Sequence, residues 1–202
     1  EMPDTYLPGE HDLVGVITGV VEKDKIITGE SIRPGDVVLG LPSSGLHTNG
    51  YSLARKLFFE VAGHDVNDLI PELEKSVGLT LLEPHINYTN HVFALLDAGI
   101  DVKGISHITG GGLIENIPRI LPDGIGVDIQ KESWPVPPVF KLMKKLGNID
   151  CDEMRRTFNM GIGIMFIVDP HNVDAVENAL EDLTTVYEIG SVVSGKKEVG
   201  FK

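Results

Sequence analysis

The chain alternates between short apolar runs and longer stretches in which apolar residues recur every three or four positions. The short runs are rich in β-branched residues and predict strands at 12–21, 37–41, 102–106, 124–129, 162–168, 186–193 and 198–201. Helical spacing predicts helices at 53–61, 83–98, 113–121, 137–146, 152–158 and 171–183. Interleaved strands and helices predict an α/β or α+β fold, in which helices cover a mixed β-sheet.

The composition is that of a globular domain. Apolar residues make up 42% of the 202 residues and charged residues 23%, and a chain of this length can bury a core without disulfides or metals. Cys151 is the only cysteine, which excludes an internal disulfide and a four-cysteine zinc site and indicates a reducing, cytoplasmic compartment. No apolar run reaches the roughly 18 residues of a membrane span, and no signal peptide is visible. We therefore expect no membrane partner.

The charge of the chain restricts its partners. Lys and Arg total 17 against 30 for Asp and Glu, giving a formal net charge of −13. Nucleic acids and anionic membranes need a basic surface, so neither is expected as a partner. A small phosphorylated ligand is compatible with this charge, because it needs only a few local donors.

Glycine is in clear excess: 23 of 202 residues are glycine, about 11% against an average near 7%. The first glycine loop, 43–50 (S-S-G-L-H-T-N-G), joins a predicted buried strand to a predicted helix. Such a loop can present backbone amides to an anion, aided by the partial positive charge of the helix N-terminus. A plain glycine turn with Asn49 or Ser52 as the helix cap is the structural alternative. The candidate ligand contacts are Ser43, Ser44, Gly45, His47, Asn49 and Gly50.

The second glycine loop, 107–112 (H-I-T-G-G-G), also follows a predicted strand and precedes a predicted helix. Each of three successive glycines costs ordering entropy, so a chain usually keeps them where its backbone must approach a ligand or another backbone. His107 is a candidate for proton transfer, and a histidine that simply ends a strand is an equal alternative. The other candidate contacts are Thr109, Gly110, Gly111 and Gly112.

The third segment, 155–163 (R-R-T-F-N-M-G-I-G), leads into the predicted strand at 162–168. Adjacent arginines diverge by about 100° on a helix, so at most one of Arg155 and Arg156 is expected to point toward a ligand. Arg155 or Asn159 would hold a phosphate or fix a loop. Neither the P-loop pattern G-x-x-x-x-G-K-[ST] nor the dinucleotide pattern G-x-G-x-x-G is present. The 7 histidines lack metal-ligand spacing, and no metal ligands are predicted.

Three long segments together resemble one family, aminoimidazole ribonucleotide synthetase, also called phosphoribosylformylglycinamidine cyclo-ligase, of purine biosynthesis. The segments are G-D-V-V-L-G-L-P-S-S-G-L-H-T-N-G-Y-S-L-A-R (35–55), H-I-T-G-G-G-L-I-E-N-I-P-R-I-L-P (107–122) and E-M-R-R-T-F-N-M-G-I-G (153–163). They stand in the order and spacing of the family, and the resemblance covers nearly the whole chain. The family often has Ser at position 48, Thr at 85 and Glu at 191, where this chain has Thr48, His85 and Ser191.

The resemblance implies an ATP-dependent ligase that closes the ring of formylglycinamidine ribonucleotide to aminoimidazole ribonucleotide, releasing ADP and phosphate. It also implies two domains. Residues 1–24 would end an N-terminal ATP-binding domain, because Glu1-Met2-Pro3 resembles the end of the family's G-G-E-T-A-E-M-P segment, and 25–202 would be the C-terminal domain. ATP and Mg²⁺ would be held mainly by the N-terminal domain. The full-length protein would be a cytoplasmic homodimer, and residues 1–202 alone would be inactive.

Within the C-terminal domain, the resemblance implies that the first two loops line a cleft between the domains and contact the substrate or its phosphate. His107 would transfer a proton. The nearest alternatives are other members of the same ATP-using superfamily: formylglycinamidine ribonucleotide synthetase, selenophosphate synthetase or thiamine-monophosphate kinase. A non-catalytic domain that binds a phosphorylated ligand is a further alternative.

Overall fold

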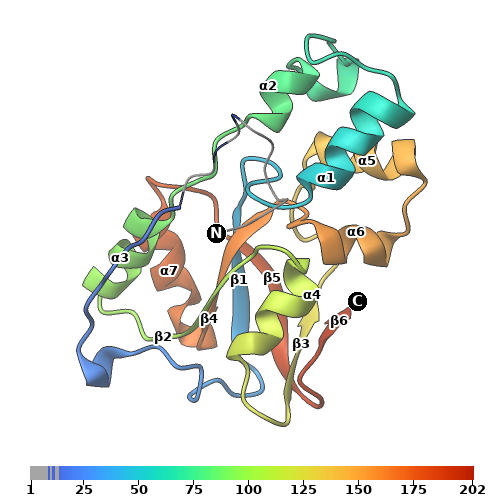
Figure 1. The fold of residues 1–202 in the computed structure, drawn as a ribbon. Coiled ribbons are helices and arrows are strands. Elements are labelled where there is room, and N and C mark those ends of the chain that lie inside the picture. Colours follow the sequence, from blue (N-terminus) through green and yellow to red (C-terminus); the bar gives the residue numbers. More distant parts are fainter. Residues whose placement is uncertain (1–8, 10, 12–13) are drawn as a thin grey trace.

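The computed structural model describes residues 9, 11 and 14–202, and within them the chain forms a six-stranded sheet with helices on both faces (Figure 1). The strands lie in the order β2-β4-β1-β5-β3-β6, and each pairing is antiparallel except the parallel pairing of β3 with β6. The predicted mixed sheet is therefore confirmed. The strands are β1 Val37–Pro42, β2 Val102–His107, β3 Ile125–Ile129, β4 Ile162–Val168, β5 Tyr187–Ser194 and β6 Val199–Phe201.

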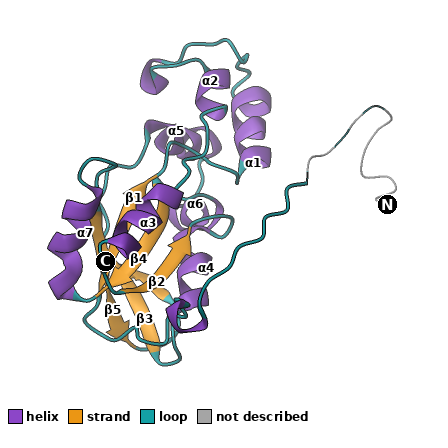
Figure 2. Ribbon diagram, turned by 90° about the vertical axis from the view of Figure 1, so that its left-hand side faces the viewer, coloured by secondary structure: helices purple, strands orange, loops and turns teal. Residues whose placement is uncertain are grey.

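The helices form three groups around the sheet (Figure 2). Helices α3 and α7 pack together on one face, α4 lies against the other face, and α1, α2, α5 and α6 gather around a separate apolar core beyond one end of the strands. None of these helices is long and apolar enough to cross a membrane. The helices are α1 Tyr51–Arg55, α2 Val77–Leu81, α3 Thr89–Asp97, α4 Gly112–Asn116, α5 Pro138–Gly147, α6 Cys151–Thr157 and α7 Val173–Leu180.

Strand β4 explains why its sequence is apolar throughout. All of its residues are buried, because both faces of the sheet are covered at this position. Met165 belongs to the core under α4, and Phe166 to the core under α3 and α7. Successive side chains of one strand thus join two cores on opposite faces of the sheet.

The helix predicted at 83–98 is shorter than expected, because it begins only at Thr89. Tertiary and capping contacts hold the preceding segment out of the helix. The hydroxyl of Tyr88 donates to the carbonyl oxygen of Pro42 (2.6 Å), and Oδ1 of Asn87 accepts from the amide of Thr89 (2.9 Å). The hydroxyl of Ser44 also donates to the carbonyl oxygen of Pro84 (2.6 Å). Residues 83–88 therefore lie along the first loop in a non-helical conformation.

The strand predicted at 12–21 does not form over the described residues 14–21. The side chains of Val16, Ile17 and Val20 are 89%, 97% and 98% exposed, since no described strand lies alongside to pair with this segment. Asp12 and Leu13, and the segment 1–3 that resembles a family motif, lie outside the described residues. Helix α2 was not predicted. The other predicted helices and the strands from 37 onward are confirmed, with shifted ends.

Candidate functional site

The two glycine loops and the third segment meet at one end of the sheet. Strand β1 leads into the first loop and β2 into the second, whereas the third segment precedes β4. Both β1 and β2 run antiparallel to β4, and Leu41 of β1 and His107 of β2 are each paired with Ile164 of β4. The ends of two strands and the start of the third therefore lie side by side.

Glycines allow the close approach between these segments. A Cβ atom at Gly50 would lie 2.2 Å from Cε1 of Phe158, and one at Gly112 would lie 1.9 Å from the carbonyl oxygen of Arg155. Both glycines also have a positive φ, 80° and 57°, which other residues rarely adopt. At Gly112 the close approach predicted from the glycine run is therefore an approach to another backbone.

Asn159 fixes the first loop to the third segment. Its side chain is buried, and its Oδ1 accepts hydrogen bonds from the Ser43 hydroxyl (3.0 Å) and the Gly161 amide (2.8 Å). Its Nδ2 donates to the carbonyl oxygens of Gly45 (2.9 Å) and Leu46 (3.3 Å). Both ends of the side-chain amide are thus occupied. Of the two roles expected for Asn159, these contacts correspond to fixing a loop.

Asn116, at the end of α4, holds the second loop in a similar way. Its buried Nδ2 lies 3.3, 3.1 and 2.8 Å from the carbonyl oxygens of Thr109, Gly110 and Gly112. The hydroxyl of Thr109 donates to its Oδ1 (3.1 Å). Asn116 was not among the residues predicted for the site, because a helix-capping role explained it equally well. The sequence feature that could have indicated its role is its position, because Asn116 follows the three glycines 110–112 by four residues and its short amide side chain can reach back to their backbone.

The same loops leave backbone amides free. The amides of 45–50 and of 109–111 donate no hydrogen bond to any described residue. The two rows are neighbours, because a Cβ atom at Gly110 would lie 3.3 Å from Oδ1 of Asn49. Unpaired amides in adjacent loops can bind an anion such as a phosphate group.

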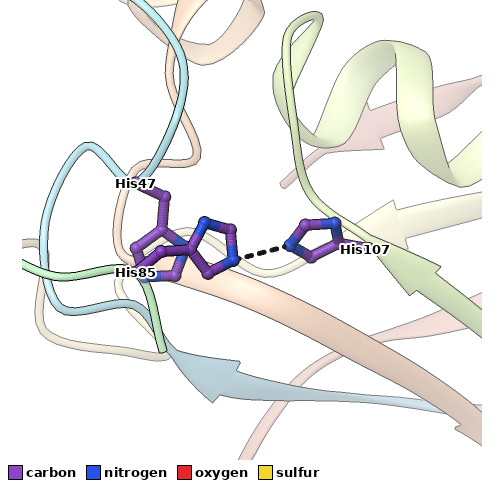
Figure 3. Close-up of side chains that lie close together, drawn as sticks. All are labelled: His47, His85 and His107. Carbon is purple, nitrogen blue, oxygen red and sulfur yellow. Dashed lines mark hydrogen bonds between the residues drawn. The ribbon is translucent and has the colours of Figure 1, made fainter. Parts of the chain in front are cut away.

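Three histidines converge beside these loops (Figure 3). His47 comes from the first loop, His107 from the end of β2, and His85 from the non-helical segment before α3. The His47 and His85 rings are stacked with centroids 4.0 Å apart, and the Nε2 atoms of His85 and His107 are 3.1 Å apart. One nitrogen from each ring lies within 4.8 Å of the other two. The sequence did not indicate this cluster, because the three histidines are far apart along the chain.

Burial keeps two of these imidazoles neutral. His47 is 4% exposed, and burial together with His85 and His107 lowers its pKa to about 4. Burial, and then His85, lowers the pKa of His107 as well. Nε2 of His47 accepts a hydrogen bond from the Ser44 amide (3.1 Å), whereas its Nδ1 has no partner in the described part of the chain. A neutral His107 can accept a proton at neutral pH.

A cavity of about 540 Å³ opens next to the histidines, and we call it the histidine cavity. Its size is within the usual range of small-molecule sites. Tyr88, whose hydroxyl is bonded to Pro42, stands edge-on to the ring of His85 in its wall. The lining residues are His85, Ile86, Asn87, Tyr88, Thr89, Val92, Phe93, His107 and Ile164.

The side chain of Arg155 does not join the histidines. Its Nη1 donates to Oδ1 of Asp152 (2.8 Å), and its guanidinium lies 4.5 Å from the ring centre of Phe201. The Arg155 backbone touches the second loop at Gly112, but the side chain lines a second cavity of about 430 Å³, which we call the basic cavity. The lining residues are Leu113, Lys131, Glu132, Trp134, Pro135, Val136, Lys141, Arg155, Met160 and Phe201.

Comparison with known proteins identifies close relatives of the chain. The C-terminal domain model of the AIR synthase related protein family matches residues 33–202. Curated relatives named phosphoribosylformylglycinamidine cyclo-ligase include those of Alkaliphilus oremlandii (strain OhILAs) and Thermoanaerobacter sp. (strain X514), 46% and 48% identical over 200 residues. The alignments cover 98% and 97% of this chain and 58% of each relative. The chain thus spans a little more than half the length of these relatives.

Solved structures share the fold at low sequence identity. HypE of E. coli, a hydrogenase maturation protein, is 24% identical with a TM-score of 0.54, over 86% of this chain and 48% of HypE. Thiamine-monophosphate kinase from Stenotrophomonas maltophilia K279a is 14% identical with a TM-score of 0.59, over 90% of this chain and 54% of the kinase. At these identities the likeness concerns the fold alone.

Proposed function

The chain belongs to the AIR synthase related family, whose C-terminal domain it carries, and we propose that it is the C-terminal part of a phosphoribosylformylglycinamidine cyclo-ligase. The main support is its identity of 46% and 48% to curated cyclo-ligases across nearly its whole length. The convergence of two glycine loops on a histidine cavity gives the proposal a site. The low identities of HypE and thiamine-monophosphate kinase give those activities no comparable support.

The proposed reaction closes a ring at the expense of ATP. The terminal phosphoryl group of ATP passes to the formyl oxygen of formylglycinamidine ribonucleotide, and an amidine nitrogen then attacks the formyl carbon. Phosphate leaves with that oxygen and the nitrogen loses a proton, so that aminoimidazole ribonucleotide, ADP and phosphate remain. Such a reaction depends mainly on positioning the reactants and on stabilising phosphate charge.

Two features of the site suit this chemistry. The free amides of 45–50 and 109–111 would bind a phosphate group of the substrate or of ATP. His107, whose pKa is lowered by burial, would accept the proton from the attacking nitrogen.

The hydroxyls of Ser43 and Ser44 donate to the carbonyl oxygens of Gly45 and Pro84. In our proposal these two serines shape the first loop, although they were expected to contact the ligand.

ATP and Mg²⁺ are requirements that we propose for the full-length protein. Mg²⁺ prefers oxygen ligands in octahedral geometry. The candidate metal cluster found among the described residues consists of imidazoles, which do not fit Mg²⁺. We therefore assign Mg²⁺ no place in this domain and derive no step from it.

The domain boundary near residue 24, the homodimer and the cytoplasmic location are also proposals, and they rest on the family resemblance. One structural feature supports the boundary. The described residues 14–21 are apolar, exposed and in no strand. That is the state expected of a segment that packs against another part of a longer protein.

A chimeric enzyme tests the proposed activity. Residues 1–202 would replace the matched part of the A. oremlandii cyclo-ligase, and the purified chimera would be assayed for ATP-dependent formation of aminoimidazole ribonucleotide. We expect turnover, together with restored growth of a purine-requiring bacterium that lacks its own cyclo-ligase.

A matched graft controls for the position of the junction. The corresponding part of the Thermoanaerobacter relative, inserted at the same junction, should also give an active enzyme. If that graft is active while the chimera with residues 1–202 is soluble, binds ATP and forms no product, the proposed activity is wrong. A non-catalytic domain that binds a phosphorylated ligand would then be the better description.

A further inference from the structure

The cluster of His47, His85 and His107 contains one ring nitrogen that the protein leaves unsatisfied. Nδ1 of His47 is buried with no hydrogen-bond partner among the described residues, and the residue is 4% exposed. Nε2 of His85 and Nε2 of His107 are hydrogen-bonded to each other at 3.1 Å. A buried polar atom without a partner is costly, and such an atom in a native structure requires an explanation.

We propose that these three histidines bind one divalent transition-metal ion that favours imidazole ligands, such as Zn²⁺. Zinc binds histidine nitrogens at about 2.0–2.1 Å, so two ligands of a tetrahedral site lie about 3.3–3.4 Å apart. The 3.1 Å between the His85 and His107 nitrogens is near that value, and all three candidate ligand atoms lie within 4.8 Å of one another. The His47 and His85 rings are stacked at an interplanar angle of 22°, so one of them would turn toward the ion on binding. Three histidines with a fourth position open is an established zinc coordination.

The cavity beside the rings leaves room for a further ligand of the ion. His85 and His107 line the histidine cavity, so the fourth coordination position would face it. Water or a phosphate oxygen can occupy that position.

Ligation by His47 has a consequence for the first loop. Nε2 of His47 accepts a hydrogen bond from the amide of Ser44. If Nε2 binds the ion, its lone pair is no longer available to the amide. If Nδ1 binds the ion, Nε2 carries the ring proton and becomes a donor. In both cases the Ser44 amide loses its acceptor, so ion binding must change the surroundings of this loop.

The ion would oppose the proposed proton transfer. A bond to Nε2 of His107 uses the lone pair that the proposed function assigns to that step. Zn²⁺ should therefore inhibit the chimeric enzyme, and EDTA added with Mg²⁺ in excess should restore it. This consequence rests on the proposed function, whereas ion binding itself does not.

Calorimetric titration of the tag-free, EDTA-treated and dialysed chain with Zn²⁺ tests the site. We expect one ion per chain and, with Co²⁺, the visible absorption of a tetrahedral complex. His85→Asn should lower Zn²⁺ affinity by at least the roughly 10–100-fold that changes to outer-shell partners cost. His171→Ala, at an exposed histidine outside the cluster, should leave the affinity unchanged. Circular dichroism in EDTA verifies that both variants are folded.

Three results would overturn the three-histidine site. The first is the absence of a stoichiometric Zn²⁺ complex, and the second is an affinity that His85→Asn changes by less than about twofold. The third is a Ser44 amide NMR signal that stays unmoved while Zn²⁺ binds, because His47 then is not a ligand. A chain that binds Zn²⁺ but gives an inactive chimera contradicts only the proposed activity, so the two proposals fail separately.

Discussion

The histidine cavity is lined by His107 of the second loop and the basic cavity by Leu113 directly after that loop, yet the two cavities differ in charge. Apolar side chains and the rings of His85 and His107 line the first, whereas Lys131, Lys141 and Arg155 line the second. Although the chain has a net charge of −13, cationic side chains gather at the basic cavity. Imidazole rings, which offer nitrogen lone pairs, line the histidine cavity. Of the residues that the sequence predicted as one site, His107 lines the histidine cavity and Arg155 lines the basic cavity.

Both glycine loops are held in place by contacts with the third segment, 155–163. Asn159 holds the first loop, which carries His47, to the third segment, which carries Arg155. Gly112 brings the second loop against the backbone of Arg155. The cavities can therefore be perturbed together through these supports, or separately through the side chains that line them.

The largest effect is expected for Asn159→Ala, which should damage both cavities at once. The change removes the acceptor of the Gly161 amide, the donor to the carbonyl oxygens of Gly45 and Leu46, and one of the two acceptors of the Ser43 hydroxyl. A buried polar group left unsatisfied costs about 1–3 kcal/mol, and we expect the free energy of unfolding to fall by about 3–5 kcal/mol. Urea unfolding followed by circular dichroism measures this. Asn178→Ala, at an exposed position of α7, should stay within about 0.5 kcal/mol of the parent.

Gly112→Ala should destabilise by about 3 kcal/mol, through strain at positive φ and a clash with the Arg155 carbonyl oxygen. Gly124→Ala is the matched control, because Gly124 has a φ of 76° and nothing within 4 Å of a Cβ atom. The control should lose only the strain, about 1 kcal/mol. Equal losses in the two variants, measured by urea unfolding, would show that the contact between the second loop and the third segment is not tight.

The parts of the fold that follow from local pattern could be predicted from the sequence. Strand β4 is buried on both faces, and its uninterrupted apolar run indicates this directly. The start of α3 could not be predicted, because the Tyr88 hydroxyl bonds to Pro42, 46 residues away in the chain. The segment 12–21 has strand composition, but a strand needs a neighbour, and no described strand pairs with 14–21.

The site could be predicted only where glycine indicates a backbone requirement. The runs at 43–50 and 107–112 indicated loops, and the structure brings them together. The histidine cluster depends on the sheet register that pairs His107 with Ile164, and on the late start of α3, which leaves His85 outside the helix that was predicted to include it. Neither the sheet register nor the start of α3 can be read from the spacing of the histidines along the chain. The side-chain direction of Arg155 is equally a product of packing, because it is set by Asp152 and Phe201.

His107→Ala in the chimeric enzyme tests the histidine cavity alone. Loss of a proton acceptor should lower turnover by about 100-fold, equivalent to about 2.7 kcal/mol in the activation free energy, with folding intact. The assay should contain EDTA together with a larger amount of Mg²⁺, so that Zn²⁺ is removed while Mg²⁺ stays available and loss of a metal ligand does not contribute. His171→Ala should keep parental turnover. A decrease of less than about threefold would show that His107 does not transfer the proton and simply ends strand β2, which is the structural alternative.

The smallest effect is expected for Arg155→Met, which removes one of the three positive charges that line the basic cavity while keeping an apolar stem over Phe201. If the reacting phosphate is bound by the loop amides, turnover and KM of the chimera should change by less than about threefold. Arg156→Met is the matched control, since the Arg156 side chain is 59% exposed and does not line the basic cavity. An increase in KM of about tenfold or more with Arg155→Met alone would place a substrate phosphate in the basic cavity. The histidine cavity would then hold the reacting part of the substrate, and the basic cavity would bind the phosphate group that anchors it.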